Sequence, residues 1–519
     1  MAKGNHLKSV FTVGALTSLS RVLGLVREMF QSRLIGAGVE QSAFTLAFAL
    51  PNMARKVFGE GALTAAFVPI FRGELEAKGL EQARQLARAV LTMAFLMMGA
   101  IVLLAVGGLT TALHFVSSDR SLLIVRLTRI LMPYMLFICA AAFGMGVLNA
   151  MGRFAAAAFM PCLLNIIWIG SLAALLFFGD LSLETRIVSV CYAILGAGFL
   201  QMLFIFVCMK RRGVSPRLVF RGWTEPSVKL VWKNTFIAAV GAGAVQVNYL
   251  LDQVLGQIAS PWAASVIGYA ERLMDLPLGI IGVSFGTVLL PTLGGFFARE
   301  DVAGAGGAFA SLLRSLFIVM IPSAVGLSFL APEVTRVIYE GHAFDAVATV
   351  RVSRALAVYS VGLVFFGCQK LLVPWFQAQR DMKTPLRVSV LTVVINAILN
   401  ILAVWLLPVE YRTVGLAVST VVCSAVGCGV LIYLACPTGL IPHLKATGKT
   451  LFRALIAAAV MGVVLQLLKE PLQVAASRFG TVLGGIVSLG GLVLSGIIVY
   501  GVGALILMKE DLKALRRRK

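Results

Sequence analysis

Charged residues are scarce in this 519-residue chain, and acidic residues are scarcer than basic ones. Asp, Glu, Lys and Arg make up 13% of the sequence, against roughly a quarter of an ordinary soluble domain. Hydrophobic residues make up 59%, and the mean hydropathy is +0.93. Apolar runs near the roughly 20 residues that cross a bilayer recur along the whole chain, which excludes a soluble domain with a single anchor. The composition predicts an all-α polytopic membrane protein.

The common patterns for metal ligands, disulfides and catalysis are also lacking. The chain has eight Cys and four His, but no CxxC pair, no HxxxH pair and no HExxH motif. The cysteines lie within apolar runs, where they pack as small apolar side chains. Residues 282–286 have the GxSxG spacing of serine hydrolases, but they lie inside an apolar run rather than at a strand-to-helix turn. We predict no metal centre, no cofactor and no catalytic site.

The apolar runs define about fourteen membrane spans. They cover residues 9–32, 42–70, 89–113, 127–150, 157–178, 187–209, 234–257, 263–295, 315–330, 353–378, 388–408, 413–436, 454–468 and 482–508. An even number places both termini on one side of the membrane. With the termini inside, 28 of the 45 Lys and Arg residues fall in inner segments, nine in outer loops and eight within spans. This bias predicts cytoplasmic termini, and it assigns the net charge of +22 to topology and anionic lipids rather than to nucleic acid.

An internal repeat relates the two halves of the chain. At an offset of 225 residues, Arg126, Arg129 and Tyr134 recur as Arg351, Arg354 and Tyr359. We therefore predict two six-helix lobes in parallel repeat, residues 1–225 and 226–449, followed by two additional spans and a basic tail in residues 450–519. Such lobes can hold a substrate cavity near the bilayer midplane and expose it on alternate sides.

Eight cations within the predicted spans need a physical reason, because burying a cation in hydrocarbon costs on the order of 3 kcal/mol. They are Arg21, Arg27, Arg55, Lys56, Arg129, Arg272, Arg354 and Lys370. Such residues usually face a bundle interior or an aqueous cavity. The first span places Arg21 and Glu28 on one helical face.

Helix breakers accompany several of these charges. Pro51 precedes Arg55 and Lys56, and Glu60 follows four residues after the lysine. In the eighth span, Pro277 follows Arg272 and Asp275. A bent helix can direct freed backbone groups toward a cavity.

We predict that four arginines bind a phosphate-bearing headgroup: Arg21, Arg27, Arg55 and Arg272. A guanidinium group donates two parallel hydrogen bonds to phosphate oxygens and keeps its charge when partly desolvated. The alternative is that each arginine forms a structural ion pair with a nearby carboxylate, Glu28, Glu60 or Asp275. The eight intramembrane cations outnumber five acids, which favours an anionic ligand.

Two further carboxylates are candidates for coupling transport to Na⁺ or protons. Asp252 lies in the seventh span near Asn248, and no cation follows it at helical spacing. Asp381, at the inner end of the tenth span, is the second candidate. The alternative for both is a hydrogen-bonded packing role.

Six motifs together resemble the MurJ (MviN) family of lipid II flippases, within the superfamily of multidrug and oligosaccharidyl-lipid exporters. They are SRVLGLVRE at 20–28, FALPNMARKVFGEGALTAAFVPIF at 48–71, LNAMGRF at 148–154, AERLMDLP at 270–277, GTVLLPTL at 286–293 and RDMKTP at 380–385. The resemblance implies fourteen helices in two lobes, a cationic central cavity, and alternating access driven by membrane potential or an ion gradient.

The family's essential cavity arginines align with the same four arginines, and its acidic cavity positions align with Glu28, Glu60 and Asp275. Two positions depart from the family pattern. Ser42 stands where relatives often have Asp, and Lys56 stands where a second Arg is common.

The resemblance implies a transporter that moves lipid II, an undecaprenyl-pyrophosphate-linked disaccharide-peptide, from the inner to the outer leaflet of the bacterial inner membrane. Membrane lipids and the cell-wall synthesis machinery are the expected partners. The alternatives are an exporter of another undecaprenyl-pyrophosphate-linked oligosaccharide and, in a different class, a membrane glycosyltransferase.

Overall fold

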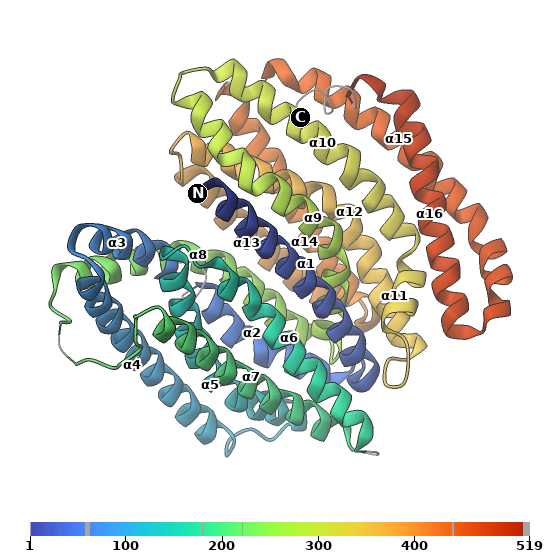
Figure 1. Ribbon diagram of the computed structural model, residues 1–519. Coiled ribbons are helices and arrows are strands. Elements are labelled where there is room, and N and C mark those ends of the chain that lie inside the picture. Colours follow the sequence, from blue (N-terminus) through green and yellow to red (C-terminus); the bar gives the residue numbers. More distant parts are fainter. Residues whose placement is uncertain (1, 58–62, 179–180, 221, 439–440, 512–519) are drawn as a thin grey trace. The chain divides into compact units, whose positions relative to one another are not determined.

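The computed structural model describes residues 2–57, 63–178, 181–220, 222–438 and 441–511. In these ranges the chain is helical, apart from short connections and one isolated bridge between Gly341 and Phe344. The helices are α1 (Ala2–Ile35), α2 (Val39–Ala54), α3 (Leu63–Lys78), α4 (Leu80–Ala112), α5 (Asp119–Ala150), α6 (Phe154–Phe177), α7 (Leu183–Arg211), α8 (Pro226–Ala259), α9 (Ala263–Phe297), α10 (Val302–Phe329), α11 (Ala331–Tyr339), α12 (Ala346–Ala378), α13 (Lys383–Leu406), α14 (Val409–Ala435), α15 (Ile441–Ala476) and α16 (Thr481–Leu507) (Figure 1).

Ten helical segments in the described part of the chain are long and apolar enough to cross a membrane. They are α4, α5, α6, α7, α10, α12, α13, α14, residues 446–479 and α16. Helices α1, α8 and α9, with 34, 34 and 35 residues, also exceed the roughly 20 residues that a crossing needs. The prediction of an all-α polytopic protein is confirmed, and the count of fourteen spans stays a prediction.

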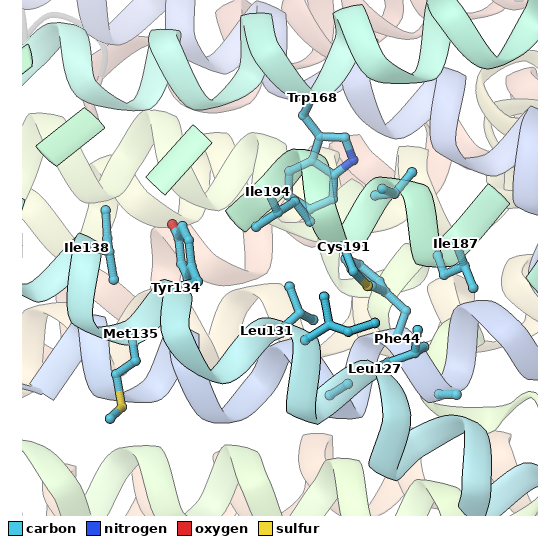
Figure 2. Packing of buried hydrophobic residues seen from close by; sticks show 14 of the residues in the cluster. Phe44, Leu127, Leu131, Tyr134, Met135, Ile138, Trp168, Ile187, Cys191 and Ile194 are labelled. Carbon is cyan, nitrogen blue, oxygen red and sulfur yellow. The ribbon is translucent and has the colours of Figure 1, made fainter. Parts of the chain in front are cut away.

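The chain forms two compact units, of which the first comprises Met1–Gln257 and Gly341–Phe344. Its central helix is α5, which packs against α2, α3, α4 and α7, while α1 packs along α6. Other helices surround α5, and 78% of the residues in its most apolar stretch are buried. Figure 2 shows Leu127, Leu131 and Tyr134 of α5 in this core, with Trp168 of α6 pointing into it.

Two glycines let α5 and α7 approach closely. A Cβ atom at Gly198 of α7 would lie 2.5 Å from the Tyr134 ring, and one at Gly144 of α5 would lie 2.3 Å from Cγ2 of Ile205. Membrane helices have no hydrophobic driving force toward one another in lipid, so close packing at small residues stabilises their contacts.

The second unit comprises Ile258–Glu340 and Asp345–Lys519, and its central helix is α12. Helix α12 packs against α9, α10 and α14, and α13 packs along α14. The same pairwise packing links α2, α4 and α7 to α5, and α6 to α7, in the first unit. Helices α15 and α16 lie side by side, drawn in orange and red in Figure 1, with α15 against α10.

The repeated sequence pattern falls on the central helix of each unit. Tyr134 of α5 and Tyr359 of α12 are both buried, and each follows a pair of arginines on its own helix. The predicted boundaries at residues 225 and 449 stay predictions.

The structure describes the second predicted span only in part. We predicted one span over residues 42–70; α2 ends at Ala54, residues 55–57 form a π-helical turn, residues 58–62 lie outside the described residues, and α3 begins at Leu63. Pro51 lies inside α2 and lacks the N–H group for one α-helical hydrogen bond. The single span over residues 42–70 stays a prediction.

The C-terminal end of α1 is hydrogen-bonded to a segment that is distant in sequence, residues 341–344. The backbone N–H of Ala343 donates to the carbonyl oxygen of Arg33 at 3.0 Å. Gly36 has a positive φ of 83°, and a Cβ atom there would lie 2.3 Å from the carbonyl oxygen of Ala343. Only glycine fits this position without moving the backbone.

The contact between α5 and α7 can be tested with two neighbouring glycines. Gly198→Ala is expected to lower the melting temperature of the detergent-purified protein, because the new methyl group meets the buried Tyr134 ring. Gly196→Ala, on the same helix with nothing within 4 Å, is the matched control and is expected to leave the melting temperature unchanged or raised. Equal melting temperatures for the two variants would contradict this account of the packing.

Candidate functional site

Arg27 on α1 is held by three partners. Its Nη1 donates to Oδ1 of Asn165 on α6 at 3.0 Å, and its Nη2 donates to Oε1 of the adjacent Glu28. The guanidinium carbon also lies 4.3 Å from the centroid of the Trp168 ring, a cation–π contact. The side chains of Arg27 and Glu28 are 13% and 15% exposed, so the pair is largely desolvated yet reachable. We call Arg27, Glu28, Asn165 and Trp168 the Arg27 site.

A chain of hydrogen bonds orients the Arg27 site. Asn165 Nδ2 donates to the carbonyl oxygen of Ser20, which binds α6 to α1. Trp168 Nε1 donates to Oε1 of Gln31 at 2.8 Å, and Gln31 Nε2 donates to Oε1 of Gln41 on α2 at 2.9 Å. The polar atoms in this series of hydrogen bonds lie within an apolar helix bundle, where an unpaired polar group costs free energy.

The sequence analysis missed Trp168, Gln31 and Gln41 as parts of this site. A helical-face count would have suggested two of them, because Trp168 lies three residues after Asn165 and Gln31 lies four residues after Arg27. The separation of 138 residues between Arg27 and Asn165 leaves no local signal that α1 and α6 meet.

Arg55 and Lys56 lie in the π-helical turn after α2. Nε and Nη2 of Arg55 donate to Oδ1 of Asn52 at 3.1 and 3.0 Å. Lys56 Nζ lies 5.2 Å from the ring centroid of Tyr249 on α8. Single π-helical turns in α-helices often occur at functional sites. Both cations are half-buried, and each contacts a neutral side chain, Asn52 for Arg55 and Tyr249 for Lys56.

The other predicted binding residues are distributed over both units. Arg21 is exposed on α1 of the first unit, six residues before Arg27. Arg272 and Asp275 are exposed on α9 of the second unit, three residues apart and therefore on one face of the helix. Glu60 lies outside the described residues. Each unit thus contributes arginine to the predicted set.

Ser42, one of the two departures from the family pattern, is fully buried at the start of α2. Gln257 of α8 donates to the Ser42 carbonyl oxygen at 2.6 Å and to its hydroxyl at 3.0 Å. Arg120 of α5 in turn donates to the backbone and side-chain oxygens of Gln257. The hydroxyl of Ser42 therefore takes part in a hydrogen-bonded link among α2, α5 and α8.

The two candidate coupling carboxylates have different surroundings. Asp252 is half-buried on α8. The side-chain oxygens of Asn248 and Gln253, on the same helix, are buried without a hydrogen-bond partner. Hard cations such as Na⁺ bind carboxylate and amide oxygens of this kind. Among the described residues, no group of three or more His, Cys, Asp or Glu side chains could hold a metal ion.

Asp381 caps the start of α13. Its Oδ1 accepts hydrogen bonds from the backbone N–H groups of Lys383 and Thr384, both at 3.0 Å. Hydrogen bonds from the side chain and backbone of Thr384 hold the pKa of Asp381 below its ordinary value. This geometry fits the hydrogen-bonded role that we gave as the alternative for Asp381, and its coupling role stays a prediction.

The family model described as lipid II flippase MurJ matches residues 31–483. The chain belongs to this family. A probable lipid II flippase MurJ of Rhizobium tropici is 31% identical over 521 residues, covering 98% of this chain and 96% of that protein. A lipid II flippase family together with ten helical segments long and apolar enough to cross a membrane, among the described residues, makes the chain an integral membrane protein.

Solved structures agree on the fold. A structure of lipid II flippase MurJ in an inward closed conformation aligns with a TM-score of 0.78 and 23% identity, covering 96% of this chain and 99% of that one. An inward-facing multidrug resistance MATE transporter of the MOP superfamily aligns with a TM-score of 0.68 and 15% identity, covering 85% and 98%. The MurJ family chain described here therefore has the fold that these two transporters share.

The cap at Asp381 gives a pH-dependent stability prediction. Asp381→Ala is expected to cost about 1 kcal/mol of unfolding free energy at neutral pH, the usual value of a helix cap. Because the folded-state pKa is lowered, the stabilisation is present above the ordinary pKa of about 4 and is lost as the pH falls through the lower folded value. Thermal unfolding of wild type and variant at a series of pH values should therefore converge only in acid. A difference that persists unchanged at the lowest pH would contradict the ionised cap.

Proposed function

We propose that this protein moves lipid II from the inner to the outer leaflet of the bacterial inner membrane by alternating access. It acts as a transporter rather than an enzyme. The observation that carries the proposal is a desolvated, permanently charged guanidinium group at the Arg27 site, in a chain that belongs to the lipid II flippase MurJ family.

The Arg27 site supports binding of an anionic headgroup. Glu28 neutralises part of the charge and Asn165 and Trp168 orient the guanidinium plane, so Arg27 is preorganised before a ligand arrives. A preorganised arginine loses little side-chain entropy when it binds a phosphate oxygen. Ion pairing and ligand binding are therefore compatible roles for Arg27.

Arg21, Arg55 and Arg272 complete the proposed pyrophosphate-binding set, with Lys56 as a further cation. Arg21 and Arg55 lie in the same unit as Arg27, and Arg272 lies in the other. Three carboxylates close to the arginines in sequence would limit affinity so that the headgroup can leave: Glu28, Glu60 and Asp275. Strong binding on both sides of the membrane would slow release, and alternating access needs unequal binding in the two states.

The proposed topology has fourteen spans, two six-helix lobes, two additional C-terminal spans and both termini in the cytoplasm. The excess of Lys and Arg in the inner segments supports this orientation. Release of lipid II at the outer leaflet would supply cell-wall synthesis enzymes, which are the proposed partners.

For energy coupling we propose Asp252 as the residue that binds Na⁺ or a proton. Its carboxylate lies one turn after Asn248, whose side-chain oxygen is buried without a donor. A cation bound by the Asp252 carboxylate would also supply a partner for the Asn248 oxygen. Asp381 already accepts two backbone hydrogen bonds, which makes it the weaker candidate.

The binding proposal predicts a loss of transport on removal of single arginines. Arg27→Ala and Arg272→Ala are expected to reduce lipid II translocation about tenfold or more, because each removes a charge-assisted hydrogen bond. The measurement is translocation and growth in cells depleted of the native flippase. Arg126→Ala is the matched control, because Arg126 pairs with Glu184 at a site where both side chains are about half exposed.

The outcomes separate the alternatives. Normal complementation by both arginine variants, at wild-type protein levels, would contradict the proposed roles of Arg27 and Arg272 in headgroup binding. Restoration of capsule or O-antigen export without lipid II translocation would favour the exporter of another undecaprenyl-linked oligosaccharide. Formation of a glycosylated product by the purified protein would favour the glycosyltransferase.

The coupling proposal predicts that Asp252→Asn removes the ion dependence of lipid II flipping in proteoliposomes. Asp381→Asn is the control, because asparagine also caps helices and keeps the hydrogen bonds without the charge. Ion-dependent flipping by the Asp252 variant, or its loss in the Asp381 variant, would contradict the assignment.

A further inference from the structure

The repeated arginine motif has different partners in the two units. In the first unit, Arg126 of α5 forms an ion pair with Glu184 of α7. In the second unit, the repeat-related Arg351 of α12 has no carboxylate partner among the described residues, and its guanidinium carbon lies 3.7 Å from the centroid of the Trp262 ring. The second copy of the motif therefore keeps a positive charge that the first copy neutralises.

A closed series of contacts brings three arginines of the second unit together. Arg351 lies over Trp262, which directly precedes α9. Arg354, one turn later on α12, lies 5.8 Å from the centroid of the Tyr411 ring on α14. Arg412, the next residue on α14, donates through Nη1 to the backbone carbonyl oxygen three residues before that tryptophan, at 3.3 Å. We call Arg351, Arg354 and Arg412 the α12–α14 arginines.

Two of these guanidinium groups have hydrogen-bond donors that no protein group uses. Within the described ranges, Arg351 and Arg354 make no hydrogen bond and no ion pair. A cation–π contact engages the charge of a guanidinium group but gives its N–H donors no oxygen acceptor. Arg351 is half-buried and Arg354 is exposed, so a ligand can reach both from outside the helix bundle.

The first turns of α9, α12 and α14 add to the positive potential. Helices α9 and α14 both pack against α12 (Figure 1), and the contacts of the α12–α14 arginines join the starts of all three. The N-terminus of each helix carries a partial positive charge.

Most of the carboxylates near these helix starts already have partners. Asp345 accepts a hydrogen bond from the backbone N–H of Ala348, and Glu340 forms an ion pair with Arg336. Within the described first turns of α9, α12 and α14, Glu410 of α14 is the one acidic residue. The α12–α14 arginines therefore keep an excess of positive charge.

We propose that the α12–α14 arginines bind the diphosphate group of a lipid at the outer leaflet, where the proposed topology places the starts of these helices. Two linked phosphates present oxygens to several guanidinium groups at once, and they carry more negative charge than the phosphodiester of a phospholipid. Trp262 and Tyr411 beside the arginines are residues typical of the membrane interface, where a lipid diphosphate lies. The source of the diphosphate rests on the proposed function, because it is the headgroup of lipid II after translocation.

The test compares lipids that differ in their phosphate groups. Full-length protein carrying Arg27→Ala and Arg272→Ala, which removes two arginines of the proposed transport site, is titrated in detergent with farnesyl diphosphate, farnesyl monophosphate and dihexanoyl phosphatidylglycerol. Calorimetry measures the affinities. The diphosphate is expected to bind about tenfold more tightly than either of the others, because it accepts more charge-assisted hydrogen bonds.

Repeat-related substitutions form a matched pair in the same background. Arg351→Gln is expected to weaken farnesyl diphosphate binding about tenfold, because it removes a charged donor from the site. Arg126→Gln changes the corresponding position of the first unit, where Glu184 is the partner, and is expected to leave the affinity unchanged. Melting temperatures check folding, and Arg354→Gln, at an exposed position, tests the site independently if Arg351→Gln lowers the melting temperature.

Hydrogen–deuterium exchange locates the binding site without any substitution in it. Farnesyl diphosphate is expected to slow backbone exchange at residues 259–263, 346–351 and 409–413, where the three helices begin. Phosphatidylglycerol at the same concentration is expected to slow exchange there less.

Three results would overturn the proposal. They are equal affinities for the diphosphate and phosphatidylglycerol, equal affinities of the Arg351 and Arg126 variants for the diphosphate, and unchanged exchange at the three helix starts. Because these assays measure binding without transport, such a failure leaves the translocation predictions for Arg27 and Arg272 standing. Failure of those predictions, with binding here intact, would remove only lipid II as the source of the diphosphate.

Discussion

Hydrocarbon offers no hydrogen-bond partner, so a polar group inside a membrane bundle must find one within the chain or accept a large energetic cost. The backbone meets this constraint by forming helices. Side chains meet it by pairing across helices, and Arg27 is the clearest case. Its guanidinium group is largely withdrawn from solvent, and Glu28, Asn165 and Trp168 surround it.

The same constraint explains how polar residues hold the first unit together. Gln31 accepts a hydrogen bond from the Trp168 N–H and donates one to Gln41. These two hydrogen bonds join α1, α2 and α6. Gln257 does the same for Arg120 and Ser42 at the same end of α2. These contacts specify helix rotation as well as proximity, because a small turn of either helix would leave a buried group unpaired.

In the second unit a buried ion pair fixes the helices that follow the repeat. Glu333 of α11 is 7% exposed, and its carboxylate lies 2.8 Å from Nζ of Lys469 on α15. Gln473, one turn later on α15, donates to the same oxygen at 3.2 Å. Breaking such a pair from one side leaves an uncompensated charge, so it specifies the contact between α11 and α15 strongly.

Several features of this protein follow from the sequence alone. Composition and the spacing of apolar runs determined the all-helical fold, the approximate place of each long helix and the identity of the charges within them, since these are local properties of the chain. Family motifs pointed to Arg21, Arg27, Arg55 and Arg272 and to the family itself. The tertiary structure decided what those residues contact. The π-helical turn that carries Arg55 and Lys56 after α2 was not visible in the apolar pattern of residues 42–70. Asn165 reaches Arg27 across 138 residues because α1 packs on α6. Such pairings depend on how whole helices pack and rotate, which no local pattern of residues encodes.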